Sequence, residues 1–117
     1  MSKTYLDGAS RTQVCLIKTG IYTGDGAATK VITGVGFTPK YLIILRHGDY
    51  IWNFAQKNDQ DGANTLFHVV PVTSQWSWWA DHIISFDADG FTVGDGSAGP
   101  ENIVNVNLNV YTYIALG

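Results

Sequence analysis

Hydrophobic and polar positions alternate along much of this chain, and the alternation is clearest near its end. From Val104 to Leu116, aliphatic residues and one threonine occupy every second position, and three asparagines, two tyrosines and Ala115 stand between them. Such a period of two is typical of a β-strand with one face in the core. Thirteen residues would span about 43 Å, which is too long for one strand of a small domain. We therefore expect a bend or loop near Asn107 to Asn109.

A second stretch, Thr33 to Leu45, predicts the centre of the fold. A Gly-rich turn with an apolar Phe37 leads to Pro39, and five apolar residues without alternation follow, Tyr41 to Leu45. A run of five is too short for a helix, and the flanking Gly and Pro residues prevent its extension. It suits a strand that is covered on both faces. We predict that it is the central strand.

Other short strands are predicted where β-branched and aromatic residues lie between turn signals. These are Val14 to Lys18, Thr29 to Thr33, Tyr50 to Ala55, Thr65 to Val72, Ile83 to Phe86 and Phe91 to Val93. Tyr50 to Ala55 should pair with the central strand as a hairpin after the turn at residues 47–49. Asp87 to Gly90 predicts a second hairpin turn.

Polar and Gly-rich segments separate these strands. Gly20 to Gly26 carries a strand end into a turn, the polar residues Gln56 to Asn64 predict a surface loop, and Gly94 to Pro100 predicts a Gly-rich loop. No segment shows helical spacing. The pattern indicates an antiparallel β-sandwich of about six to eight strands, formed by residues 14–117 as one domain, with residues 1–13 as an N-terminal arm.

Composition narrows the class of protein. A chain of 117 residues can bury a core without a disulfide or metal, and the single Cys15 is predicted to be a small buried hydrophobe. The net charge is −3 and no Lys or Arg cluster occurs, so nucleic acid is not an expected partner. No stretch has the length of a signal peptide or a membrane span, so we expect a soluble protein made without a leader and not inserted in a membrane.

Motifs that suggest catalysis or cofactor binding lack the context they need. Gly94 to Gly99 has dinucleotide-loop spacing, but Pro100 and an alternating segment follow it, where a helix would have to begin. Asp59-x-Asp61-Gly62 and Asp87-x-Asp89-Gly90 lack the acid at the twelfth position of a calcium loop, so turn-forming Asp is the better interpretation.

The three histidines His47, His68 and His82 show no metal-ligand or catalytic spacing with one another or with Cys15. We therefore predict that the protein is not an enzyme and has no cofactor or metal site.

Aromatic residues are the feature with functional promise. Tyr and Trp rings stack on sugars and also anchor protein interfaces. Two of the four Trp residues are expected in the core, but Trp78 and Trp79 are adjacent, so one of them must point away from it in a strand. The candidate contact residues for a subunit or a glycan are these aromatics and nearby loop residues: Asp49, Tyr50, Trp52, Trp76, Trp78, Trp79, His82 and Asn105.

Four motifs together resemble a module of phage virion proteins, chiefly tail-fibre and other appendage proteins. They are Gly20-x-Tyr22-Thr23-Gly24-Asp25-Gly26, Ile32-Thr33-Gly34-Val35-Gly36-Phe37-x-Pro39, Asp87-x-Asp89-Gly90-Phe91-Thr92-Val93-Gly94 and Tyr111-x-Tyr113-Ile114-Ala115-Leu116. The chain resembles the H-type lectin sandwich less closely. A departure is Leu108-Asn109-Val110, where such modules often have a Gly before the last aromatic strand.

The resemblance implies a β-sandwich that is commonly trimeric and is built into a virus particle. We therefore expect a structural virion protein, as a capsid decoration or as a component of a head or tail fibre. Its partners would be further copies of itself, as a homotrimer, and other virion proteins. The alternative is a lectin-like, carbohydrate-binding module that recognises a glycan on the host surface.

Overall fold

The computed structural model describes residues 16–46, 52–62, 64–70, 77–80, 82–95 and 104–117, with the backbone alone at residues 52–54, 64, 66–70 and 77–79. These residues form nine strands and no helix, so the described part of the chain contains no helix that could cross a membrane. The strands are β1 (Ile17–Thr23), β2 (Thr29–Ile32), β3 (Tyr41–Arg46), β4 (Trp52–Asn58), β5 (Asn64–Val70), β6 (Ser77–Ala80), β7 (Ile83–Asp87), β8 (Gly90–Gly94) and β9 (Val110–Leu116).

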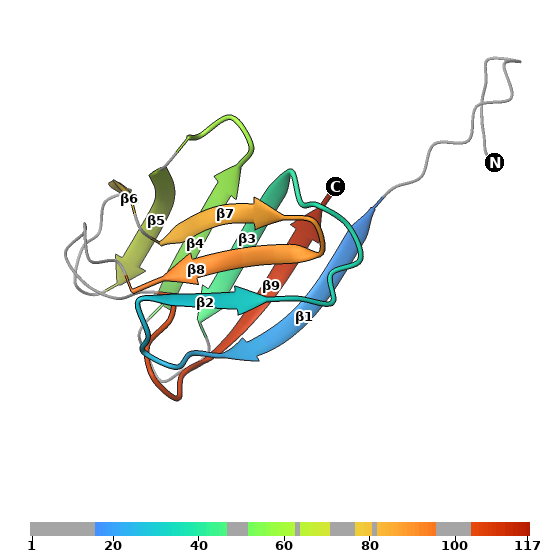
Figure 1. Cartoon of the computed structure of the whole chain (residues 1–117). Helices are drawn as coiled ribbons and strands as arrows, with labels where there is room; N and C mark the ends of the chain where they lie inside the picture. The colour runs from blue at the N-terminus through green and yellow to red at the C-terminus, as the bar shows by residue number, and fades with distance from the viewer. Residues whose placement is uncertain (1–15, 47–51, 63, 71–76, 81, 96–103) are drawn as a thin grey trace, which may run out of the picture.

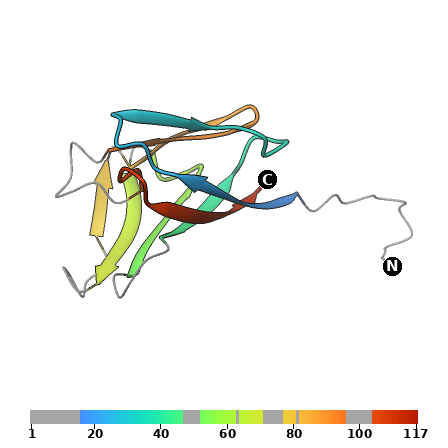
Figure 2. The same ribbon diagram turned by 90° about the horizontal axis from the view of Figure 1, so that it is seen from below.

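The strands form two antiparallel sheets packed face to face (Figures 1 and 2). The large sheet has six strands in the order β1-β9-β3-β4-β5-β6, and the small sheet has three in the order β2-β8-β7. The predicted antiparallel β-sandwich is thus confirmed. Figure 1 shows the small sheet lying across the large one, so one face of the large sheet is covered and the other is turned away from the rest of the described residues.

The central strand is confirmed as β3, which pairs with β9 on one side and β4 on the other. Leu42 and Ile44 are buried against the small sheet. The expected cover on both faces is wrong for this chain, however. Tyr41 and Ile43 are half-buried and Leu45 is exposed, because the described residues place no second layer over the outer face of the large sheet.

The alternating C-terminal segment bends as predicted. Residues 104–109 are irregular and make a turn at Asn107 and Leu108, and β9 begins directly after them at Val110. The core face of β9 carries Tyr111, Tyr113 and Ala115, and the more aliphatic set of positions faces outward. Hydropathy alone would favour the opposite choice, so the core selects the aromatic rings here for a different reason.

That reason is aromatic packing, both within the large sheet and between the two sheets. The rings of Tyr22 and Tyr111 stack at 5.0 Å between centroids, and the ring of Phe91 meets Tyr113 edge-on at 5.0 Å. The hydroxyl of Tyr22 donates a hydrogen bond of 2.7 Å to the Val104 carbonyl, so the buried ring keeps a polar partner. Large rings fill the space between the sheets, and the Tyr111 hydroxyl also has a partner, because it accepts from Val106 N–H at 3.1 Å.

The predicted loop from Gln56 to Asn64 is much shorter than expected. β4 continues to Asn58 and β5 begins at Asn64. Lys57 can occupy an inward strand position because its ammonium group donates to the Gly62 carbonyl, which leaves the side chain buried. The Asp61 carboxylate accepts from the Asn58 backbone N–H and closes the turn. A polar sequence therefore forms strand ends here.

The Gly-rich turn before the central strand is held by the β7–β8 hairpin. The Asp89 carboxylate accepts from the backbone N–H groups of Gly34 and Gly36 at 3.0 and 2.7 Å, and the Asp89 carbonyl accepts from Val35 N–H. The predicted hairpin is confirmed, with Ala88 and Asp89 as its turn. Gly90 has another role, because a Cβ there would lie 1.9 Å from the Ile32 carbonyl oxygen.

Most of the remaining strands were predicted, but the first strand is shifted along the chain and β6 was not predicted. β2, β5, β7 and β8 cover the predicted segments within one or two residues, apart from residues 71 and 72, which lie outside the described part. The first strand was predicted at Val14 to Lys18, but β1 runs from Ile17 to Thr23, because it pairs along its whole length with β9. Val14 and Cys15 lie outside the described residues.

Candidate functional site: the outer face of the large sheet

Three neighbouring strands of the large sheet, β1, β9 and β3, determine the character of its outer face. Pairing is continuous from Ile17 opposite Leu116 to Thr23 opposite Val110, and from Tyr41 opposite Leu116 to Arg46 opposite Tyr111. Residues that pair across an antiparallel sheet share a face. Because Tyr22, Tyr111 and Leu42 are buried on the inner side, the alternate residues of each strand lie on the outer side.

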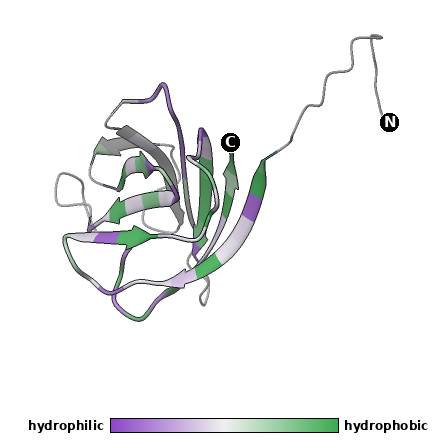
Figure 3. Ribbon diagram, turned by 45° about the vertical axis from the view of Figure 1, so that its right-hand side comes forward, coloured by the Kyte–Doolittle hydropathy of each residue, from purple (hydrophilic) through white to green (hydrophobic). Residues whose placement is uncertain are grey.

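The outward residues form rows across the three strands. Ile17, Leu116 and Tyr41 make the first row, Thr19, Ile114 and Ile43 the second, Ile21, Thr112 and Leu45 the third, and Thr23 and Val110 the fourth. Neighbours in a row lie about 5 Å apart, so the aliphatic side chains form a continuous surface. Figure 3 shows hydrophobic residues recurring along these strands.

Much of this surface is open to solvent in the single chain. The exposed fraction is 67% for Ile21, 57% for Ile17 and 41% for Leu45, and Val110 is also exposed. The other outward aliphatic residues, Ile43, Ile114 and Leu116, are half-buried among their neighbours. Burying such surface releases about 25 cal/mol for each Å², so this face favours contact with another apolar surface.

None of these outward positions carries a charged residue; besides the aliphatic residues they hold only threonine and Tyr41. A strand in a sheet with one face in water normally alternates apolar and polar residues, and its polar residues, such as Lys and Glu, lie on the face in water. Here the two sides of β9 are both apolar or aromatic. Large apolar patches of this kind are typical of sites that contact a protein, a membrane or a ligand.

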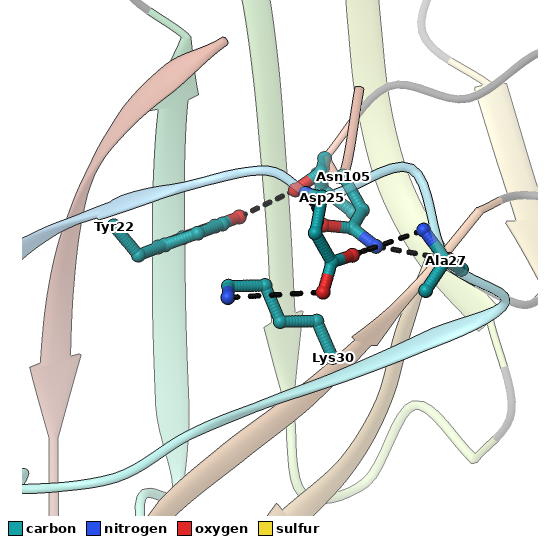
Figure 4. Close-up of polar contacts among 6 residues, drawn as sticks. Tyr22, Asp25, Ala27, Lys30 and Asn105 are labelled. Carbon is teal, nitrogen blue, oxygen red and sulfur yellow. Dashed lines mark hydrogen bonds and ion pairs between the residues drawn. The ribbon is translucent and has the colours of Figure 1, made fainter. Parts of the chain in front are cut away.

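A polar cluster ends this face at one end of the sandwich (Figure 4). Asn105 is fully buried and its side-chain amide donates to the Asp25 carboxylate and to the Ala27 carbonyl, both at 2.9 Å. The backbone N–H of Asp25 donates to the Asn105 side-chain oxygen at 3.0 Å. The cluster joins the turn after β1 to the turn before β9, and so fixes where the two strands meet.

The charge in this cluster is held within the chain. The backbone N–H of Ala27 and the Asn105 amide lower the pKa of the Asp25 carboxyl, and Lys30 adds an ion pair at 3.9 Å. With its oxygens engaged by groups of the same chain, Asp25 stabilises the loop. The arrangement is typical of a structural junction.

Two of the predicted contact residues lie inside the protein. His82 and Asn105 are both fully buried, so they cannot offer a contact surface to a subunit or glycan, and that prediction is corrected for them. The His82 ring nitrogen Nδ1 lies 2.9 Å from the Ala80 carbonyl, and its own carbonyl accepts from Gly94 N–H. Asn105 belongs to the junction with Asp25. Both polar residues are buried because local partners satisfy them.

For the aromatic candidates, the structure describes the backbone of Trp52, Trp78 and Trp79 but not their side chains. Trp52 of β4 pairs with Val70 of β5. It lies two positions before Phe54, which pairs with the outward residue Leu45 of β3. Trp78 and Trp79 pair with Leu66 and Thr65 in β5. Their predicted contacts remain predictions. Asp49, Tyr50 and Trp76 lie outside the described residues.

Sequence reasoning missed the residues that form the face, although a signal was present. Ile17 and Ile21 alternate in β1, and Val110, Ile114 and Leu116 alternate in β9. The sequence pattern groups the residues of β9 on one face of a strand, but it does not show which face is the core. The tyrosines between them indicate that both faces of β9 are suited to burial.

A second feature of the surface is a hollow of about 410 Å³ at the opposite end of β3. It is lined by Thr38, Pro39, Lys40, Lys57, Asp59, Gly62, Ile84, Ser85 and Phe86. Burial lowers the pKa of Lys57, and the Asp61 carboxylate partly opposes that shift. The hollow brings hydrogen-bond donors and acceptors together beside an aromatic ring. Among the described residues, no three His, Cys, Asp or Glu side chains gather to hold a metal ion.

Comparison with known families covers almost all of this architecture. Residues 15–117 match the family described as "Domain of unknown function (DUF7483)". The chain belongs to this family. The match begins just before β1 and includes every described strand, so the sandwich is the family's domain. No curated protein matches the chain, and no solved structure matches it.

Proposed function

We propose that this protein is a structural component of a phage particle, a capsid decoration or part of a head or tail fibre, which self-associates through the outer face of the large sheet. The uncharged aliphatic surface of β1, β9 and β3 is the observation that supports it. The virion setting rests on the resemblance of the sequence motifs to phage appendage modules, from which we also expect a homotrimer.

The size of the face can be compared with that of a stable interface. The three strands β1, β9 and β3, about 4.8 Å apart and about 24 Å long, present roughly 350 Å², somewhat under half of the roughly 800 Å² that each partner contributes to an interface of standard size. Homo-oligomer interfaces are also more apolar than the rest of a protein surface. The face therefore has the apolar character of a homo-oligomer interface, and residues around it would have to supply the rest of the contact area.

The matched pair Ile21→Lys and Val31→Lys tests the self-association. Ile21 and Val31 are exposed to 67% and 61%, but Val31 lies on β2, at the edge of the small sheet. We expect sedimentation velocity to show an oligomer for the natural protein and for Val31→Lys, and a shift to monomer for Ile21→Lys, because a buried charge opposes association. A natural protein that stays monomeric at high concentration would contradict self-association.

The virion assignment has a separate test. Mass spectrometry of purified phage particles from the source culture should find the chain among the particle proteins, and cryo-electron microscopy should show it as a repeated sandwich. A chain that is made in infected cells but is absent from the particles would contradict the assignment. This outcome would leave the self-association itself in place.

Carbohydrate binding is the second candidate function, and the hollow beside Lys57 favours it. Phe86 offers a ring to the apolar face of a sugar, and Asp59, Lys40 and Ser85 offer partners to its hydroxyl groups. A glycan array with the assembled protein tests this function. Binding that is lost in Phe86→Ala and retained in Val31→Ala supports it, and an array without binding removes it.

A further inference from the structure

Strand β1 has a backbone partner on one side only in the described part of the chain. It stands at the end of the strand order of the large sheet, with β9 as its neighbour. Figure 1 shows no described strand beyond it. All seven residues of β1, Ile17–Thr23, pair with β9 in one unbroken register. The opposite side of β1 is therefore a long and regular sheet edge.

The hydrogen bonds at the two ends of the β1–β9 ladder show which backbone groups face this edge. The Gly117 N–H donates to the Leu16 carbonyl at 3.0 Å, and the Gly24 N–H donates to the Asn109 carbonyl at 2.8 Å. Both pairs continue the register of the ladder, in which bonded and non-bonded pairs alternate. Alternate residues from Lys18 onward therefore bond to β9. The residues between them turn their N–H and C=O groups to the open edge: Ile17, Thr19, Ile21 and Thr23.

The other three sheet edges carry features that hinder pairing with a further strand, and β1 lacks most of them. Natural proteins protect their edges with short strands, bulges, prolines or charges. β2 and β6 have four residues each, and β7 has a break in register between Ile83 and Ser85. β1 is longer, has no proline and no bulge, and carries one charged residue, Lys18, near its start. This edge is the one best suited to accept another strand.

The residues of β1 fit a second β1 that runs in the opposite direction. When the Gly20 residues of two copies lie opposite each other, Ile17 lies opposite Thr23, and Thr19 lies opposite Ile21. All four residues with outward backbone groups then pair with one another. Each bonded pair exchanges two hydrogen bonds, so the two strands form about eight. The paired side chains are β-branched, and such residues favour strand pairing.

The charged residue of β1 agrees with the same register. Lys18 of one copy lies opposite Tyr22 of the other, so the two ammonium groups do not meet. A register centred on Lys18 would place the two lysines directly opposite each other, where like charges repel, and would pair fewer residues. The strand is thus complementary to itself in one particular alignment, and a second copy of the chain is the occupant that this edge fits.

We propose that two copies of this chain pair through their β1 edges, antiparallel about Gly20, and so join their large sheets into one. This contact goes beyond the proposed contact through the outer face, because it uses backbone groups at the sheet edge. Residues that pair across strands share a face, so the outer faces of the two copies adjoin on one side. Together they present roughly 700 Å², close to the roughly 800 Å² of a standard interface.

Amide hydrogen exchange of the natural protein, followed by NMR at increasing concentration, tests the edge pairing. The N–H groups of Lys18, Gly20 and Tyr22 should exchange slowly at every concentration, because they bond to β9. Those of Thr19 and Ile21 should exchange rapidly in the monomer and at least about tenfold more slowly in the pair. Contact through the outer face alone does not produce this alternation. Rapid exchange of Thr19 and Ile21 in an oligomeric sample would overturn the inference.

A proline at position 19 tests the same contact by mutation. Thr19→Pro removes an N–H donor at the open edge and leaves the bonds to β9 in place, so edge pairing should weaken at least about tenfold by sedimentation equilibrium. Thr19→Val keeps the N–H group and a β-branched side chain, and should pair within about threefold of the natural protein. Circular dichroism checks that Thr19→Pro is folded. If it is not, the exchange pattern of the natural protein decides.

Leu45→Lys separates this inference from the proposed function. Leu45 is 41% exposed on the outer face and lies on β3, away from the β1 edge, so the variant should lose the face contact and retain the edge pair. Ile21→Lys opposes both contacts, because the two new lysines also lie diagonally across the strand pair.

Three outcomes are decisive. If Thr19→Pro assembles like the natural protein, edge pairing is overturned and the face contact stands. If Leu45→Lys changes nothing and Thr19→Pro is monomeric, the face contact is overturned and edge pairing stands. A natural protein that is monomeric at every concentration overturns both.

Discussion

Asp25 and Asn105, 80 positions apart in the sequence, exchange two hydrogen bonds: Asp25 N–H donates to the side-chain oxygen of Asn105, and the Asn105 amide donates to the Asp25 carboxylate. This pair joins the turn that follows the first strand to the turn that precedes the last one. Because those two strands are neighbours in the sheet, the pair closes one end of the sandwich. Removal of this pair should therefore destabilise the whole fold.

We expect Asn105→Ala to lower the free energy of unfolding by about 2–3 kcal/mol, because it leaves the Asp25 N–H and the Ala27 carbonyl without their partner. Urea denaturation followed by Trp fluorescence measures the change. Asn107→Ala is the control, since Asn107 is exposed and its loss should cost less than about 0.5 kcal/mol. Equal effects of the two substitutions would show that the pair contributes nothing specific.

Asp89 should make the stability of the fold depend on pH in the acidic range. Hydrogen bonds from Gly34 N–H and Gly36 N–H lower the pKa of its carboxyl in the folded chain. A lowered folded pKa means that its contribution is present above the unfolded value of about 3.9 and is lost as pH falls through the folded value. We expect Asp89→Asn to melt below the natural protein near neutral pH, and the gap to close in acid.

Circular dichroism melting curves at several pH values measure this gap. The melting temperature of the Asp89→Asn protein should still fall in acid, because hydrogen bonds also lower the pKa of the Asp25 carboxyl. A gap of constant size from neutral pH to strong acid would mean that the Asp89 carboxylate has no role as a charged acceptor.

A substitution at Gly90 would test how closely β8 approaches β2 in the small sheet. A Cβ at this position would lie 1.9 Å from the Ile32 carbonyl oxygen, and backbone atoms cannot move aside as a side chain can. We expect Gly90→Ala to cost about 3 kcal/mol or more. Gly34→Ala is the matched substitution: its Cβ has open space, and its φ of +85° costs about 1–2 kcal/mol. Equal losses in urea denaturation would contradict the steric argument.

The buried tyrosines should make the fold sensitive to alkali. Burial raises the pKa values of Tyr22 and Tyr111 above the ordinary value of about 10. Since the folded chain favours the neutral phenols, stability is retained below that pH and declines above it. We expect these tyrosines to ionise together with unfolding, as an ultraviolet titration of tyrosinate would show. Full ionisation with the near-ultraviolet circular dichroism unchanged would contradict this.

The sequence was sufficient to predict most of the strands, because their signals are local, although it placed the first strand too early and did not predict β6. β-branched and aromatic runs between turn residues identified β2, β7 and β8, and the Gly- and Pro-flanked run identified β3 as central. The bend near Asn107 followed from length alone. Each of these inferences uses neighbours in sequence, and backbone conformation responds to the same neighbours.

Burial was harder to predict because it depends on distant partners. Asn105 is a polar residue that hydropathy assigns to the surface, and it is buried because Asp25 and Ala27 satisfy its amide. Lys57 enters a strand that sequence reasoning ended at Ala55, because the Gly62 carbonyl accepts its ammonium group. Partners of this kind are unknown until the fold is known.

The candidate site was the least predictable part. Sequence reasoning expected the contact surface at Tyr50 and the tryptophans, whose side chains lie outside the described part, and it did not identify the outward face that contains Ile114. Which side of β9 is covered depends on where the small sheet lies, and that sheet is placed by the aromatic contacts of Phe91. The sequence pattern showed two faces suited to burial, and only the three-dimensional arrangement shows which one the chain covers itself.

The position of β9 has a consequence for how the protein is made. It is the last strand along the chain, yet it is inserted between β1 and β3, the first and third strands. On the ribosome, the two earlier strands cannot be bridged until residues 110–116 have emerged, so the large sheet is completed after synthesis of the domain. Until then β1 and β3 expose unpaired edges, and newly made copies are open to mispairing with one another before assembly begins.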